Sequence, residues 1–116
     1  MARYTCSFEI TAPVDRLSSL IVEILESCYL DLIYDTGDYI MAREIPGRVA
    51  FPQLVTVEVL IDRTNATARN ASVSFVTKNE ELPLQVENHC QQMFELVKTA
   101  AIESPHWEIH EKMAVV

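Results

Sequence analysis

The chain has 116 residues and a formal net charge of −8, and 49% of its residues are hydrophobic. This length and composition predict a single globular domain spanning residues 1–116 and exclude an intrinsically disordered chain. Proteins that bind nucleic acids gather Lys and Arg on one surface. The nine basic residues of this acidic chain are scattered, so we expect no nucleic-acid partner.

The N-terminal residues and the cysteines bear on the compartment. Residues 1–10 lack the apolar segment of a signal peptide, and no stretch approaches the ~18 apolar residues needed to cross a bilayer. We therefore expect a cytoplasmic protein without membrane insertion. Cys6, Cys28 and Cys90 fit no zinc-binding spacing, so we expect them to be free, buried thiols.

The first predicted elements are a strand and a helix. Residues 3–10 alternate between apolar and polar side chains, which is typical of a half-buried strand. Thr11-Ala12-Pro13 then changes the period. Apolar residues recur at helical spacing from Val14 to Cys28, which predicts an amphipathic helix of about four turns.

Four strands are predicted next. Residues 29–35 and 39–45 flank a hairpin turn in which Gly37 can adopt a positive φ. Residues 54–62 and 67–78 alternate again, with a turn at residues 63–65 between them. Pro46, Gly47 and Pro52 predict a stiff connection, which we call the 43–54 loop.

A second helix is predicted from Leu82-Pro83 to about Ile102, followed by a stop at Ser104-Pro105 and a short final strand over residues 106–112. Its apolar stripe would be Val86, Cys90, Met93, Phe94, Val97 and Ala101, and acidic Glu80, Glu81 and Glu87 near its start suit the helix dipole.

The resulting order, β-α-β-β-β-β-α with a short C-terminal strand, predicts an α+β fold. Short connections imply one antiparallel sheet of about five strands, and the one-sided apolar stripes imply that both helices pack on the same face. The opposite face would be mostly polar, interrupted by Leu60 and Val76, and more apolar if Tyr39 and Met41 also point there. Mixed surfaces of this kind often bind a partner.

The sequence contains no catalytic motif, so we do not expect an enzyme. His106 and His110 on an extended strand would lie ~13 Å apart at ~3.3 Å per residue, too far for one metal ion even with Glu108 between them. Asp31, Asp35 and Asp38 lack the spacing of a calcium loop. Adjacent His89 and Cys90 point in different directions on a helix. We therefore expect no metal site and no cofactor.

The 43–54 loop supplies most of the candidate interaction residues, because Arg and Phe are enriched at protein interfaces. Phe51 either contacts a partner or folds back to cover one end of the core, and we favour the second alternative. For Arg48 we favour exposure, since guanidinium groups are seldom buried without a partner. The full set of interaction candidates is Arg43, Arg48, Phe51, Leu60 and Val76.

Residues 4–17 read Tyr-Thr-Cys-Ser-Phe-Glu-Ile-Thr-Ala-Pro-Val-Asp-Arg-Leu. This segment resembles the first strand and helix of the START/Bet v1-like superfamily, where a strand ends in an Ile-x-Ala-Pro phrase and leads into a helix. The closing helix after antiparallel strands looks similar too. The resemblance implies a curved sheet that grips a C-terminal helix, often around a pocket for an apolar ligand. The sequence as a whole also resembles small cyanobacterial proteins.

We therefore expect a non-catalytic protein-interaction or assembly module that acts through the free sheet face and the 43–54 loop, with another protein or a second copy as its partner. The alternative is a carrier for a small apolar ligand held between sheet and helices. A solid core would use the same residues as such a pocket, so the sequence does not separate the two. The candidate lining residues are Phe8, Ile24, Val57, Phe75, Met93 and Phe94.

Overall fold

The computed structural model describes residues 1–62, 70–82 and 88–111. The strands are β1 (Ala2–Thr11), β2 (Leu30–Asp35), β3 (Tyr39–Glu44), β4 (Thr56–Asp62), β5 (Asn70–Asn79) and β6 (Glu108–Glu111). The helices are α1 (Leu17–Ser27) and α2 (His89–Glu103), and short 3-10 turns occupy Val14–Arg16 and Phe51–Gln53.

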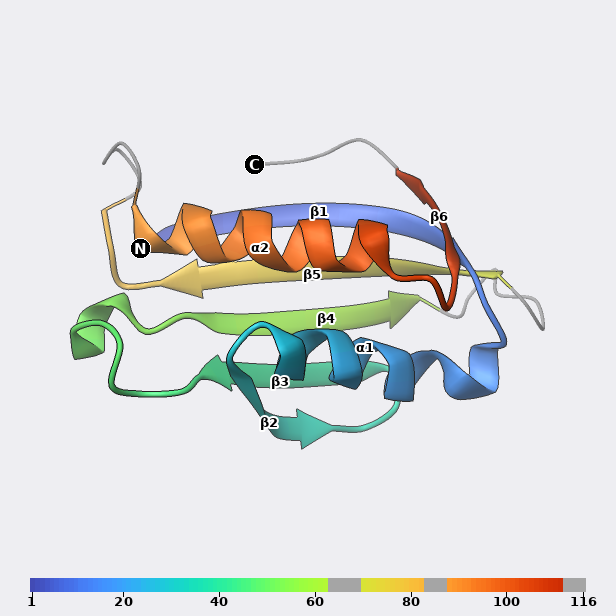
Figure 1. Ribbon diagram of the computed structural model, residues 1–116, viewed down its shortest axis with the longest axis horizontal. Coiled ribbons are helices and arrows are strands. Elements are labelled where there is room, and N and C mark those ends of the chain that lie inside the picture. Colours follow the sequence, from blue (N-terminus) through green and yellow to red (C-terminus); the bar gives the residue numbers. More distant parts are fainter. Residues whose placement is uncertain (63–69, 83–87, 112–116) are drawn as a thin grey trace.

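The strands form one antiparallel sheet in the order β2-β3-β4-β5-β1-β6 (Figure 1). β1 lies between β5 and β6 and pairs with β5 over ten positions, from Ala2 opposite Asn79 to Thr11 opposite Asn70. The predicted α+β class with a single antiparallel sheet is confirmed. The described sheet has six strands rather than about five, because the short C-terminal segment pairs with β1.

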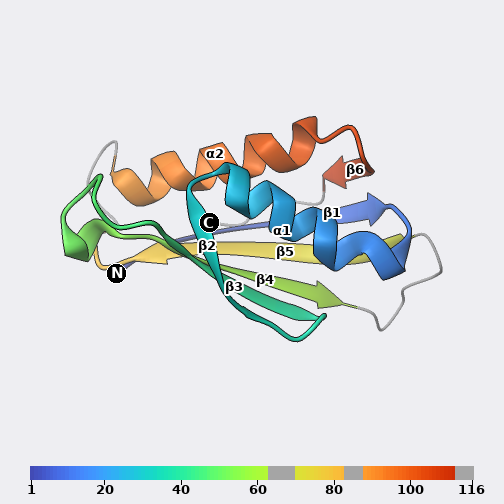
Figure 2. The same ribbon diagram turned by 60° about the horizontal axis from the view of Figure 1, so that its bottom comes forward.

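Both helices lie on the same side of the sheet (Figure 2). The alternating residues of β1, β4 and β5 that face them form the core, in which Phe8, Val57 and Phe75 are at most 1% exposed. Tyr4 stacks on Phe94 of α2 with ring centroids 5.5 Å apart. The opposite surface of the sheet carries the intervening side chains. We call it the free face.

The helix boundaries differ from the predicted ones. Val14–Arg16 form a 3-10 turn, so α1 begins at Leu17. Leu82 is not helical, and α2 begins at His89 with Asn88 as its N-cap, whose side chain accepts the backbone N–H of Gln91 at 2.7 Å. The predicted helical positions Val86 and Glu87, the turn at 63–65, and residues 67–69 and 112 lie outside the described residues.

α1 ends in a backbone turn at Tyr29, a residue that was expected to belong to the following strand. Cys28 is its C-cap, and Tyr29 has a φ of 65°, the left-handed conformation that usually follows a helix end. This reversal sends the chain directly into β2. Within the described residues, neither α1 nor α2 combines the length and hydropathy that would carry it across a bilayer.

Candidate functional site

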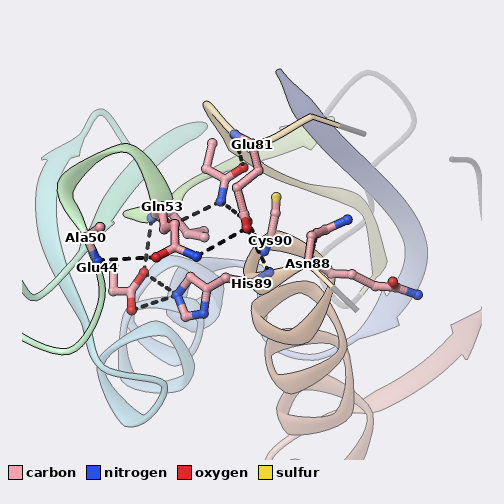
Figure 3. A network of polar contacts seen from close by, with 10 residues as sticks. Glu44, Ala50, Gln53, Glu81, Asn88, His89 and Cys90 are labelled. Carbon is pink, nitrogen blue, oxygen red and sulfur yellow. Dashed lines mark hydrogen bonds and ion pairs between the residues drawn. The ribbon is translucent and has the colours of Figure 1, made fainter. Parts of the chain in front are cut away.

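A contact between an imidazole and a buried carboxylate joins the end of β3 to the first turn of α2. His89 Nε2 lies 2.8 Å and 2.9 Å from the two carboxylate oxygens of Glu44 (Figure 3). The Glu44 carboxylate also accepts the backbone N–H of Val55 at 3.1 Å. The Glu44 side chain is 0% exposed and that of His89 is 16% exposed. A carboxylate buried this deeply is tolerated because its oxygens have partners.

Glu81 holds the N-terminus of α2. Its carboxylate accepts the backbone N–H groups of Cys90 at 2.9 Å and His89 at 3.3 Å, and the side-chain amide of Asn79 at 2.6 Å. Burial by itself raises the pKa of Glu81, but these hydrogen bonds outweigh it, so its pKa lies below the ordinary value. A negative charge at this helix end also complements the helix dipole, as the sequence pattern indicated.

The same network fixes the second half of the 43–54 loop. The Asn79 amide donates to the backbone carbonyl of Gln53 at 3.0 Å, and the N–H of Glu80 donates to the carbonyl of Pro52 at 3.3 Å. Gln53 closes the turn on itself, since its N–H donates to the Ala50 carbonyl at 2.8 Å and its side chain accepts the Ala50 N–H at 3.3 Å. The loop is therefore tied to β5 and to the segment before α2.

Phe51 stands on this anchored turn with 84% of its surface exposed. The favoured expectation that it folds back over the core was wrong. Gln53, rather than Phe51, turns inward, because its polar groups satisfy the backbone groups of Ala50 and reach toward Glu81 at 3.5 Å. The ring of Phe51 is left at the surface.

A groove of about 320 Å³ runs beside this ring. Arg43 and Thr56 enter it from the sheet and Glu80 from the segment after β5. No described residue forms a hydrogen bond or ion pair with the Arg43 guanidinium, which is an exposed cation in an acidic chain. The groove thus combines an apolar wall with a charge that a partner can neutralise. Its lining residues are Arg43, Pro46, Phe51, Pro52, Leu54, Thr56 and Glu80.

Arg48 does not line this groove. Its guanidinium carbon lies 4.1 Å from the centroid of the Tyr29 ring, in a cation–π contact, and the side chain is exposed as expected. The structure therefore brings Arg43 and Phe51 together at one groove and places Arg48 on the side of the loop nearest the α1–β2 turn.

The free face has an apolar corner, which we define as Tyr34, Tyr39, Met41 and Leu60. Leu60 is 47% exposed and lies opposite Tyr39 in the pairing of β3 with β4. The Tyr34 and Tyr39 rings are 6.0 Å apart. Tyr34 could not be assigned from alternation alone, because an irregularity between Leu32 and Tyr34 shifts the register of β2 by one residue.

Val76 contributes little to this surface, since it is only 5% exposed. It lies on β5 in the middle of the sheet, and the side chains of Thr5 on one side and Glu58 on the other flank it. Of the two apolar candidates on the free face, Leu60 is therefore the accessible one.

Glu58 is the centre of the polar part of the free face. It forms an ion pair with Lys78 and accepts a hydrogen bond from the Tyr39 hydroxyl. Lys78 and then Tyr39 lower the pKa of Glu58. In return, the contact with Glu58 raises the pKa of Tyr39 to about 12.

The residues expected to line a ligand pocket belong to the core cluster instead. Phe8 and Phe75 meet edge to face with centroids 6.0 Å apart, and Val57 is fully buried. Ile24 also borders a cleft of about 310 Å³ between α1 and the end of α2. The other members of the set, Met93 and Phe94, are at most 8% exposed.

Reactive thiols and metal ligands are not brought together by the described part of the chain. Cys6, Cys28 and Cys90 are buried, and none of them forms a disulfide bond. Burial raises the pKa of the Cys28 and Cys90 thiols, the latter to about 12 with a further contribution from Glu81. Among the described residues, no group of three or more His, Cys, Asp or Glu side chains is placed to hold a metal ion.

No model of a protein family, no curated protein and no solved structure matches this chain. The resemblance of residues 4–17 to the START/Bet v1-like superfamily therefore stays a prediction. The residues that sequence reasoning missed, chiefly Glu44, Gln53 and Asn79, carry no local signal. Their partners are up to 45 residues away in the chain. A Glu in a strand is normally expected to be exposed, and only its contact with His89 explains why Glu44 is buried.

Proposed function

We propose that this protein is a non-catalytic interaction module that binds a protein partner through the 43–54 loop and the adjoining free face. The observation that carries the proposal is the exposure of Phe51, which is 84% exposed. It lies on a loop that hydrogen bonds of Gln53 to Ala50 and Asn79 hold in place. Aromatic and Arg side chains dominate binding energy at interfaces. A loop that is already ordered loses little conformational entropy when a partner binds.

The groove beside Phe51 supports the same function. The groove of about 320 Å³ lies at the lower end of the range of about 300–1,000 Å³ for ligand pockets, and this is enough room for an inserted apolar side chain. Its apolar wall and the Arg43 guanidinium, which pairs with no described residue, favour a partner segment that presents an apolar side chain beside a carboxylate.

We further infer a cytoplasmic setting for this module. It is supported by the three cysteines, which are buried and form no disulfide bond, as is usual in a reducing compartment.

The test is partner capture with the tagged full-length chain. Arg48→Ala combined with Phe51→Ala should reduce capture of specific partners at least about tenfold, as expected when a hot-spot aromatic is removed. Leu96→Ala combined with Ile102→Ala is the matched control, because these apolar side chains on α2 are 41% and 43% exposed. The single change Arg43→Ala reports on the groove separately.

Partners retained equally by the loop variant and the control would overturn the assignment of the loop as the binding site. Replacing Phe51 with a photo-crosslinking phenylalanine analogue gives an independent measurement. Crosslinks to the same partners are expected at position 51 and not at position 96.

A further inference from the structure

The free face is a broad surface that none of the described segments covers. Both helices lie on the other side of the sheet (Figure 2). Cross-strand pairing assigns its central residues, with Arg3 beside Lys78, Thr56 beside Arg43, and Glu58 beside Met41. An antiparallel sheet can expose one face to water when that face is polar. The free face of this sheet also carries the apolar corner, and exposed apolar patches often mark a binding surface.

Charge separates the free face from the rest of the molecule. The whole chain carries a net charge of −8. On the four central strands, in contrast, the free face carries three basic and three acidic side chains, so it is formally neutral. Two copies of so acidic a protein repel each other least where such a neutral surface is brought together. These six residues are Arg3, Arg43, Lys78, Glu9, Glu58 and Asp62.

Several polar groups of the free face are already bonded to one another. Glu58 contacts Lys78 and the Tyr39 hydroxyl, and the hydroxyls of Ser7 and Ser74 share a hydrogen bond of 2.8 Å. Ser72 donates to Glu9 at 2.8 Å. Removing water from a polar group costs free energy chiefly when the group is then left without a hydrogen-bond partner. These residues therefore retain their hydrogen bonds when a second surface excludes water.

The apolar corner supplies a driving force for contact. Leu60 and Tyr34 are 47% and 54% exposed, and Tyr39 lies between them on β3. Burying apolar surface contributes roughly 25 cal/mol per Å². Tyr is also a residue type that interfaces favour, because its ring is rigid and its hydroxyl tolerates water.

The area of the free face matches a specific interface. The four central strands at ~4.8 Å spacing and about eight residues at ~3.3 Å per residue give on the order of 500 Å² per copy. Two copies would bury on the order of 1,000 Å² in total, which is about the area that a specific interface needs.

We propose that two copies of this chain pack their free faces against each other and form a symmetric dimer, with the apolar corner inside the interface. The proposal rests on the proposed function only in taking the free face as a binding surface. It assigns that face to a second copy and leaves Phe51 and the loop side of the groove open for another protein, whereas Arg43 and Thr56 belong to both surfaces. Facing sheets in such a dimer lie ~10 Å apart.

The test is the molar mass of the purified full-length chain, measured by sedimentation equilibrium over a wide range of concentrations. The expected mass rises with concentration toward twice 13.2 kDa. Leu60→Glu places a charge in the interface and should raise the dissociation constant at least about tenfold. Leu96→Glu is the matched control, because Leu96 is 41% exposed on α2, on the other side of the sheet, and should leave the constant unchanged. Circular dichroism verifies that both variants fold.

A monomer at every concentration would overturn the proposal, and so would a dimer that Leu60→Glu leaves intact. A dimer lost in the Arg48→Ala and Phe51→Ala double variant, but kept in Leu60→Glu, would assign self-association to the loop instead. Partner capture is measured separately, so a monomeric chain that still captures partners through Phe51 refutes the dimer and leaves the proposed function standing.

Discussion

His89 Nε2 lies within 2.9 Å of both carboxylate oxygens of Glu44, and the Glu44 side chain is fully shielded from solvent. This contact links the strand that leads into the 43–54 loop to the helix that follows β5. The surface that we assign to partner binding is thus built on a buried contact between an imidazole and a carboxylate. Its geometry depends on residues that no partner would touch.

Removing the imidazole should destabilise the whole domain. After His89→Ala, the Glu44 carboxylate stays buried, and among the described residues only the backbone N–H of Val55 still donates to it. Losing one member of a buried pair typically costs about 3–5 kcal/mol. We expect a loss of about 3 kcal/mol in the free energy of unfolding, at the lower end because His89 is 16% exposed. Urea denaturation measures it.

The exposed His106 provides the comparison for this change. His106→Ala should alter the free energy of unfolding by less than about 0.5 kcal/mol. Equal stability of the two variants would show that the pair between His89 and Glu44 does not hold the domain together.

The Tyr39 contact with Glu58 predicts a specific dependence on pH. The hydrogen bond to Glu58 raises the pKa of Tyr39 to about 12 in the folded protein, above the ordinary ~10 of the unfolded chain. The folded state therefore holds the phenolic proton more tightly. This stabilisation is complete below about pH 10 and is lost as the pH rises toward 12.

Tyr39→Phe isolates that effect. The difference in free energy of unfolding between the natural chain and this variant should be largest below about pH 10 and should shrink above it, as measured by urea unfolding at successive pH values. Tyr34→Phe removes a phenol from the same face without touching the Glu58 contact, so its difference should not shrink in this way. A constant difference for Tyr39→Phe would contradict the assigned contact.

The three cysteines should be unreactive in the folded protein. All are buried, and burial raises the pKa of Cys28 and Cys90, which keeps the nucleophilic thiolate scarce. A thiol-specific chromogenic disulfide at neutral pH should label none of them natively and all of them in urea. Rapid labelling of one thiol in the native chain would show that its side chain is accessible.

Tyr29 gives a test of the backbone at the end of α1. Its φ of 65° is unfavourable for any residue with a Cβ and acceptable for Gly. Tyr29→Gly and Tyr29→Ala both remove the ring under Arg48. The two variants therefore differ mainly in how readily residue 29 adopts a positive φ. We expect the Gly variant to be more stable by about 1 kcal/mol.

The same pair of changes at Thr99, an exposed position inside α2, should have the opposite order. There Thr99→Gly should be less stable than Thr99→Ala by about 1 kcal/mol, because Gly is a poor helix former. Thermal or urea unfolding of the four variants decides both points. The same order at both positions would mean that Tyr29 is not held in the left-handed conformation.

The strands and helices of this protein follow from local pattern. Alternation over residues 3–10 predicts a strand with one buried side. The 3.6-residue period from Leu17 to Cys28 predicts a helix with one apolar stripe. Each element buries its apolar side against the rest of the chain. One-sided elements with short connections then lead to an antiparallel sheet that both helices cover from the same face. Residue types alone thus determined the fold class and most members of the core.

The surface that we propose for binding was decided by contacts between distant parts of the chain. Phe51 is exposed because Gln53 turns inward and forms hydrogen bonds with Asn79 and Glu81. Val76 is shielded because β5 lies in the middle of the sheet between β1 and β4. Glu44 is buried because His89, 45 residues later, meets it. Local pattern reports which side of an element is apolar. Which polar groups pair, and hence which rings remain at the surface, depends on the packing of the whole sheet against its helices.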